Sequence, residues 1–154
     1  MSWFARLIYR ALVWKERQRA QRARSLTERE DGRAAHLQTG ERGESLAYWF
    51  LRQAGYTIVA RNRRRRAGGG ELDLVGWDGP VLAFVEVKTR TSAEAGPPEA
   101  ALRSDQQQRI VRAAKEFLRR QRRTAVNYRF DVVSVSWDPE AGYKVRLIKD
   151  AFKG

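Results

Sequence analysis

Two carboxylates and an amine fall close together in one stretch of the chain, 70–90, which reads GELDLVGWDGPVLAFVEVKTR. Asp73 lies in the first apolar run of this stretch, and Glu86 and Lys88 form a Glu-x-Lys pair in the second. Charged groups among so many apolar neighbours are costly to bury unless a metal ion or a substrate uses them. The residue types therefore indicate a site that holds a metal ion or binds a substrate.

A β-hairpin is the element that would position these groups. The apolar runs Leu72–Trp77 and Val81–Val87 flank the turn signal Asp78-Gly79-Pro80, a pattern typical of a hairpin. Because alternate residues of a strand share a face, we expect the Asp73 side chain on one face of the strand and the Leu72 and Leu74 side chains on the other.

The second strand of this hairpin carries Glu86 and Lys88 on one face, by the same alternation. An isolated Glu-x-Lys on a strand is usually a solvated, weak ion pair. Antiparallel pairing would bring Asp73 opposite this pair, in surroundings of strong positive charge. Taken together, these features favour a site over a surface ion pair.

The metal-ligating residues available to the chain are few. It has no cysteine, which excludes disulfides, thiolate zinc sites and a cysteine nucleophile. The single histidine, His36, lies in a polar stretch, where an ordinary exposed histidine is the favoured interpretation. Carboxylates would therefore have to hold the metal, and Mg²⁺ or Mn²⁺ suits such oxygen ligands.

The net charge of +13 over 154 residues is typical of proteins that bind nucleic acid. Charge alone indicates contact with a polyanion and no chemistry. A basic run can be a solvated loop, or it can hold phosphates through bidentate contacts. The residues predicted to contact nucleic acid are Arg61, Arg63, Arg64, Arg65, Arg66, Arg90, Arg109 and Arg112.

Hydrophobic spacing predicts two helices and five strands. The helices are expected over 43–54 and 104–122, and the strands over 56–62, 72–77, 81–87, 129–137 and 143–148. This order, α-β-β-β-α-β-β, predicts an α/β fold with a mixed sheet and a helix on each side.

Glu44 lies at the edge of the inward face of the first of these helices. It can be an ordinary acidic residue favoured by the helix macrodipole near the N-terminus. It can also lean over the sheet towards Asp73 and Glu86. The spacing favours neither interpretation.

The domain organisation has three parts: residues 1–24, a basic amphipathic helical extension; residues 25–40, a polar linker; and residues 41–150, the main domain. No apolar run in the extension is long enough to span a bilayer. Three interpretations compete for it: a docked helix, a basic amphipathic helix that contacts a membrane surface, a partner or nucleic acid, or a floppy tail. A loosely attached helix ranks first.

Several motifs occur in a fixed order that resembles the YraN-like family, a bacterial group of endonuclease-like proteins. These are Gly43-Glu44, Gly55-Tyr56, Arg61-Asn62, Gly70-Glu71-Leu72-Asp73-Leu74, Phe84-Val85-Glu86-Val87-Lys88-Thr89-Arg90 and Arg129-Phe130-Asp131-Val132-Val133. The resemblance covers roughly residues 37–148. The family looks like a branch of the PD-(D/E)xK nuclease superfamily, which includes archaeal Holliday junction resolvases.

This resemblance implies a restriction-endonuclease-like fold and a catalytic set made of Glu44, Asp73, Glu86 and Lys88. The implied metal ligands are Asp73, Glu86, the backbone carbonyl of Val87, and Glu44 directly or through water, with Mg²⁺ or Mn²⁺ as the ion. In one departure from the family, position 106 carries glutamine where a lysine is frequent.

The expected function is therefore that of a metal-dependent endonuclease that acts on nucleic acid in the bacterial cytoplasm, with DNA as the favoured substrate. The kinship allows a homodimer, because resolvases of that type cut two strands symmetrically. The alternative from another class is a non-catalytic nucleic-acid-binding or DNA-processing accessory protein that retains the fold. A third alternative is a membrane-surface adaptor that binds through the N-terminal helix.

Overall fold

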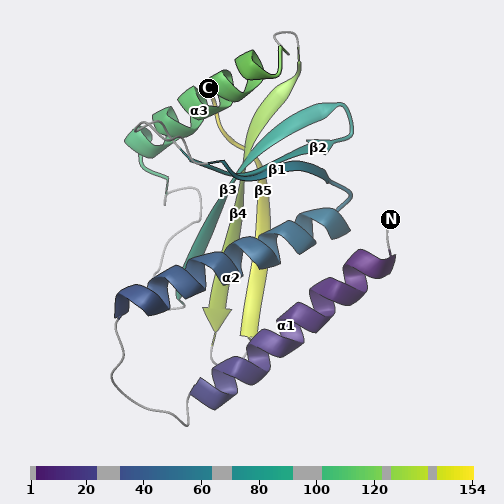
Figure 1. Ribbon diagram of the computed structural model, residues 1–154, viewed down its shortest axis with the longest axis vertical. Helices are drawn as coiled ribbons and strands as arrows, with labels where there is room; N and C mark the ends of the chain where they lie inside the picture. The colour runs from purple at the N-terminus through teal and green to yellow at the C-terminus, as the bar shows by residue number, and fades with distance from the viewer. Residues whose placement is uncertain (1–2, 24–31, 64–70, 92–101, 123–125, 139–141) are drawn as a thin grey trace.

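The computed structural model describes residues 3–23, 32–63, 71–91, 102–122, 126–138 and 142–154. They form one mixed five-stranded sheet with helices on both faces (Figure 1). The elements in chain order are α1 (Trp3–Ala23), α2 (Gly32–Gln53), β1 (Thr57–Arg63), β2 (Leu72–Asp78), β3 (Val81–Thr91), α3 (Ser104–Arg120), β4 (Tyr128–Asp138) and β5 (Gly142–Phe152). The predicted order of helices and strands is confirmed.

Strands follow one another across the sheet in the order β1-β2-β3-β4-β5. Every neighbouring pair is antiparallel except β3 and β4, which run parallel. Parallel strands need a crossover connection, and the chain between β3 and β4 contains α3. The predicted hairpin is present, and Gly79 at its turn has a φ of 57°, a conformation that suits glycine.

Apolar side chains form one core on each face of the sheet. The α3-side core joins Ile110 and Ala114 of α3 to Phe84 and Val132 of the sheet. The α2-side core joins Leu46 and Leu51 of α2 to strand residues such as Val85 and Val133. The sheet is therefore the middle layer of three, and α2 and α3 cover its opposite faces (Figure 1).

The N-terminal extension is helical, as predicted, and α1 lies alongside α2 on the same side of the sheet (Figure 1). Tyr9, Leu12 and Val13 pack against the α2-side core, and the Tyr9 ring meets the Phe50 ring edge-on at a centroid distance of 5.9 Å. Of the alternatives considered for this segment, the structure has a docked helix. No helix in the described part of the chain is long and apolar enough to cross a membrane.

The start of α2 differs from the sequence prediction. We expected a helix from Gly43 and a polar linker over 25–40, but the helix begins at Gly32. Residues 32–40 are therefore helical, while residues 25–31 lie outside the described residues. Low apolar content is typical of a linker, yet a polar stretch can extend a helix whose later turns are packed. The glycines in this stretch cost only about 1 kcal/mol each.

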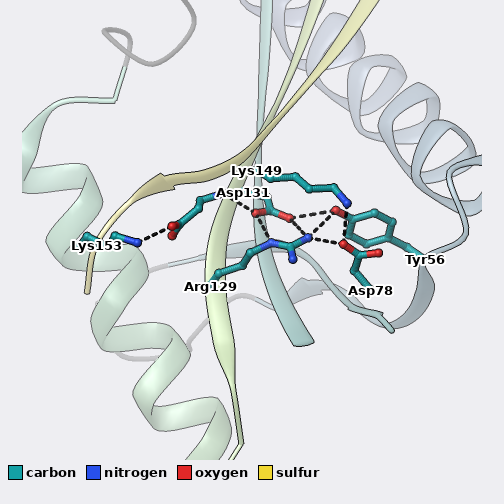
Figure 2. Close-up of polar contacts among 7 residues, drawn as sticks. Tyr56, Asp78, Arg129, Asp131, Lys149 and Lys153 are labelled. Atoms are coloured by element: carbon teal, nitrogen blue, oxygen red, sulfur yellow. Dashed lines mark hydrogen bonds and ion pairs between the residues drawn. The ribbon is translucent and has the colours of Figure 1, made fainter. Parts of the chain in front are cut away.

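A buried polar network fixes the end of the sheet that contains the hairpin turn (Figure 2). Asp131 on β4 is fully buried, and both of its carboxylate oxygens accept hydrogen bonds from the Arg129 guanidinium, at 2.8 and 3.1 Å. The Tyr56 hydroxyl donates to Asp131 Oδ2 at 3.0 Å. Burial, and then the Asp131 charge, raises the pKa of Tyr56, so this hydroxyl stays a donor at physiological pH.

The same network reaches β2 and β5. Arg129 also pairs with Asp78 at 2.5 Å, and Lys149 pairs with Asp78 at 2.6 Å. Hydrogen bonds from Lys149 and Arg129 lower the pKa of Asp78. The backbone N–H of Asp150 donates to Asp131 Oδ1 at 2.9 Å, where the pairing of β4 with β5 shifts register. Residues before β1 and on β2, β4 and β5 are thereby tied together.

Replacing Arg129 by methionine should strongly destabilise the protein. The substitution leaves the buried Asp131 carboxylate without its guanidinium partner, and breaking a buried pair in this way costs roughly 3–5 kcal/mol. Urea unfolding at pH 7 would measure the difference. Lys153→Met is the matched control because Lys153 is an exposed partner of Asp150, and it should unfold like the wild type. Equal stability of the two variants would contradict the structural role of the network.

Candidate active site

The Asp73 side chain lies where β2 and β3 separate. Ladder pairing between these strands ends at Leu74 and Val85, whereas β2 continues to pair with β1 as far as Leu72. Beyond that point the Asp73 carboxylate takes the place of a backbone acceptor, because Oδ2 accepts the Val87 N–H at 2.7 Å. A side chain thus bridges the two strands at the position where their backbones part.

The face alternation predicted for the start of β2 is wrong at one residue. Leu72 and Leu74 were expected on the same face, but Leu72 joins the α3-side core and Leu74 joins the α2-side core. Strict alternation holds only in a regular ladder, and the ladder between β2 and β3 ends here. The irregularity therefore coincides with the position of Asp73.

Glu86 on β3 is 8% exposed and has two partners on one oxygen. Its Oε1 accepts a hydrogen bond from Gln106 Nε2 at 2.7 Å and lies 3.0 Å from Lys88 Nζ. Gln106 belongs to the first turn of α3, so the helix that covers this face of the sheet also holds the carboxylate.

The two carboxylates are close enough to oppose each other's ionisation. Burial, and then the charges of Glu86, Glu44 and Glu71, together raise the pKa of Asp73 to about 8. The hydrogen bond from Val87 acts in the opposite direction. A proton on Asp73 relieves this repulsion at neutral pH, and a divalent cation between the carboxylates would relieve it more fully.

Glu44 lies on α2, is half-buried, and acts on Asp73 through its charge. Its position depends on an unusually close contact at Gly43. A Cβ on Gly43 would lie 1.9 Å from Oγ1 of Thr89 on β3, so only glycine permits this packing. The contact sets α2 directly against β3 and brings the Glu44 charge to bear on Asp73.

The Asp73 and Glu86 carboxylates supply hard oxygen donors of the kind that suits Mg²⁺ or Mn²⁺. In the described residues, no three acidic or histidine side chains stand together closely enough to hold a metal ion. Mg²⁺ is commonly bound by one or two carboxylates together with water and substrate phosphate. The two carboxylates therefore fit such an ion, with Glu44 placed farther out.

A basic surface continues from the carboxylates along the same face of the sheet. Cross-strand pairing aligns Lys88 with Ser134 of β4, and Ser134 with Arg146 of β5. The next row aligns Arg90, Ser136 and Lys144. Lys144 and Arg146 are exposed, and β4 and β5 run on beyond α3 (Figure 1). We call these six residues the basic rows.

Several of these residues were missed by sequence reasoning. Lys144 and Arg146 alternate with apolar residues in β5, which was a usable signal, but their neighbours could be identified only once the strand order was known. Gln106 was noted only as a departure from the family, and its contact with Glu86 depends on where α3 packs.

The arginines predicted to bind nucleic acid are spread over several elements. The Arg61 guanidinium lies 4.5 Å from the centre of the Tyr48 ring on α2. Arg90 belongs to the basic rows. On α3, Arg109 pairs with Asp105 at 2.8 Å and Arg112 is exposed. Arg63 is the last residue of β1, and its side chain is not among the parts that the structure describes. Arg64, Arg65 and Arg66 lie outside the described residues.

Asp73→Asn should stabilise the protein at high pH in the presence of EDTA. Asparagine keeps an oxygen for the Val87 N–H and removes the ionisable group. The pKa of Asp73 is raised from 3.8 to about 8, so between these values the folded protein holds a proton that the unfolded chain has lost. This residue therefore makes wild-type stability fall as the pH rises from about 4 to about 8.

The stability of the variant should not show this part of the decrease with pH. At pH 9 its free energy of unfolding should exceed that of the wild type by about 1–3 kcal/mol. Urea unfolding at pH 5, 7 and 9 would measure it. Parallel pH profiles for the two proteins would contradict the raised pKa.

Gly43→Ala and Gly40→Ala should change stability in opposite directions. Both glycines lie inside α2, where alanine is favoured by up to about 1 kcal/mol. A Cβ on Gly40 meets nothing within 4 Å, so Gly40→Ala should be stabilising. Gly43→Ala collides with Thr89 and should cost roughly 1–3 kcal/mol. The double variant Gly43→Ala/Thr89→Ala should recover most of the loss in thermal unfolding, and no recovery would refute the contact.

Residues 43–135 match the family described as "Uncharacterised protein family UPF0102". Similar relatives are the UPF0102 proteins of Solibacter usitatus, 48% identical over 113 residues (73% of this chain and 84% of the relative), and of Syntrophus aciditrophicus, 44% identical over 118 residues (77% and 91%). A third, from Koribacter versatilis, is 45% identical over 120 residues (76% and 80%). The homologues are bacterial, and the match includes both strands that carry the candidate site. The chain therefore belongs to the UPF0102, or YraN-like, family.

Proposed function

We propose that this protein is a metal-dependent endonuclease that hydrolyses phosphodiester bonds in nucleic acid, with DNA as the expected substrate. The observation that carries the proposal is the grouping of Asp73, Glu86 and Lys88 beside the point where β2 and β3 separate. The resemblance of the motifs to the PD-(D/E)xK superfamily supports the same assignment. It also implies that the mixed sheet is of the restriction-endonuclease-like type.

Asp73 and Glu86 would hold a Mg²⁺ or Mn²⁺ ion with the Val87 carbonyl, and Glu44 would contribute directly or through water. When bound, the ion supplies Lewis acidity, which lowers the pKa of a coordinated water and stabilises charge on the scissile phosphate.

The chain's own groups have distinct parts in this scheme. Lys88, which lies 3.0 Å from Glu86, either positions the attacking water or neutralises the phosphate. Gln106 fixes the Glu86 carboxylate through a neutral donor, so it adds orientation without cancelling the negative charge that a cation needs. Val87 fixes Asp73 in the same way through its N–H.

The basic rows supply a path for the substrate backbone. Each row places a serine between two basic side chains across β3, β4 and β5, and the first row includes Lys88. A phosphate backbone lying on this surface would pass beside Glu86. Contacts of this kind provide sequence-independent affinity that weakens steeply as salt rises.

Replacing Asp73 by alanine, Glu86 by glutamine or Lys88 by alanine should each reduce cleavage at least about a thousandfold, because each removes a group that would hold the metal ion or act on the reacting phosphate. A panel of junction, flap, duplex, single-stranded and RNA substrates with Mg²⁺ and Mn²⁺ would measure it. Binding of the same substrates should persist in the Asp73 and Glu86 variants, whereas Lys88→Ala should also lose part of the affinity, because Lys88 belongs to the basic rows. Equal cleavage by wild-type and Asp73→Ala preparations would point to a contaminating nuclease and remove the support.

Arg146→Gln should weaken nucleic-acid binding by roughly five- to tenfold at moderate salt and lower the slope of log affinity against log salt by about 0.9 for a duplex. The matched control is Arg120→Gln, because Arg120 is exposed at the far end of α3 and pairs with Glu116 at 2.8 Å. Fluorescence anisotropy over a salt series would measure both. An unchanged slope in Arg146→Gln, or the same loss in both variants, would remove the basic rows from the substrate path.

The second candidate function is a non-catalytic nucleic-acid-binding protein that retains this fold. The observation in its favour is that no group of three acidic or histidine side chains that could hold a metal ion comes together in the described residues. Such a protein would bind through the basic rows with an affinity indifferent to EDTA and to changes at Asp73 or Glu86. It would cleave no member of the substrate panel.

A bacterial enzyme of the proposed kind would act in the cytoplasm, where the chromosome lies. A homodimer would present two such sites to two strands of one substrate. Both expectations depend on the nuclease assignment.

A further inference from the structure

Helix α1 has apolar residues on two opposite faces, and only one of these faces is packed. The inner face contains Ala5, which is 2% exposed, and the residues that join the α2-side core. The outer face contains Trp3, Phe4, Leu7 and Trp14, with exposures of 75, 61, 52 and 65%. Among the described residues, Val59 is the only other large apolar side chain that is exposed.

Basic residues border this apolar surface on both sides. At about 3.6 residues per turn, Trp3, Leu7 and Trp14 fall in one line along the helix. Arg6 and Arg10 lie along one edge of that line, and Phe4 and Lys15 towards the other. All of these side chains are exposed.

None of the described side chains on the outer face of α1 is acidic. The single acidic residue in the sequence of α1 is Glu16, which is 7% exposed and lies 3.7 Å from Arg42 of α2. The outer face of α1 is therefore an apolar strip between cationic edges.

We propose that the outer face of α1 binds the surface of a membrane rich in anionic phospholipid. A helix of this pattern lies in the plane of the interface with its apolar side chains among the acyl chains. Tryptophan favours that boundary, and arginine and lysine at the edges reach the headgroup phosphates while their stems cover apolar surface. The helix would rest on the membrane and not cross it.

A second copy of the chain fits this face poorly. Symmetric pairing of two α1 helices would bring Arg6, Arg10 and Lys15 of one copy against the same cationic edges of the other, and such like-charge contacts are unfavourable. A nucleic acid would engage the edges but leave the apolar strip in water. An anionic lipid surface satisfies both parts of the face.

The position of α1 leaves the rest of the molecule accessible. It lies alongside α2 on the α2 side of the sheet, where it also contacts β5, whereas α3 covers the opposite face (Figure 1). The basic rows belong to the α3 face, so membrane docking through α1 would not cover them.

The test is binding of the full chain to phosphatidylcholine vesicles with and without phosphatidylglycerol. Co-sedimentation and tryptophan fluorescence would measure the binding. We expect binding, with a blue shift of the emission, only when phosphatidylglycerol is present. Arg10→Gln/Lys15→Gln should bind roughly thirtyfold more weakly, because each basic side chain near an anionic surface contributes about a factor of five.

The triple variant Trp3→Ser/Leu7→Ser/Trp14→Ser should lose binding altogether. Val59→Ser, which removes an exposed apolar residue on β1, is the matched control and should bind like the wild type. Thermal unfolding checks that the variants are folded. If the triple variant does not fold, the Arg10→Gln/Lys15→Gln variant still tests the proposal.

Three results would overturn the proposal. Equal binding to vesicles without phosphatidylglycerol would remove the role of charge, and undiminished binding by the folded triple variant would place the contact elsewhere. Self-association that depends on Trp3, Leu7 and Trp14, with no vesicle binding, would identify a second copy as the occupant. None of these measurements involves cleavage, so they stand apart from the nuclease proposal.

Discussion

Repulsion between two carboxylates in a poorly hydrated part of the sheet is the constraint around which this structure is arranged. Asp73 is partly buried beside Glu86, and its pKa is raised to about 8 because ionisation there is opposed by burial and by neighbouring negative charge. A protein has no structural need for such a pair, since an apolar pair of similar volume would be more stable. The arrangement is understandable if a cation occupies the space when the protein functions.

The surrounding elements hold this unfavourable group in place from three directions. Val87 fixes Asp73 from β3, Gln106 fixes Glu86 from α3, and the absence of a side chain at Gly43 lets α2 approach β3 closely. At the other end of the sheet, the network around Asp131 ties four segments together (Figure 2). Stability gained there and in the two cores offsets the electrostatic cost of the two carboxylates at the site.

Much of this arrangement could be predicted because it depends on local patterns. The hairpin follows from two apolar runs around a Gly-Pro turn, and the element order follows from hydrophobic spacing. The helical residues before Gly43 were missed because polarity alone does not separate a linker from a solvated helix. The face of Leu72 was wrong because the ladder ends there. The contacts of Gln106 and Arg146 depend on packing and strand order, which one sequence does not reveal.

The most direct test of the central claim is calorimetric titration of the protein with Mn²⁺ at pH 7 and pH 9, in buffers of different ionisation enthalpy that count the protons released. If the ion binds between Asp73 and Glu86, about one proton should leave per ion at pH 7 and far fewer at pH 9, because the pKa of Asp73 is about 8. Asp73→Asn should release none. Absence of Mn²⁺ uptake, or uptake with the same proton count at both pH values, would contradict the account.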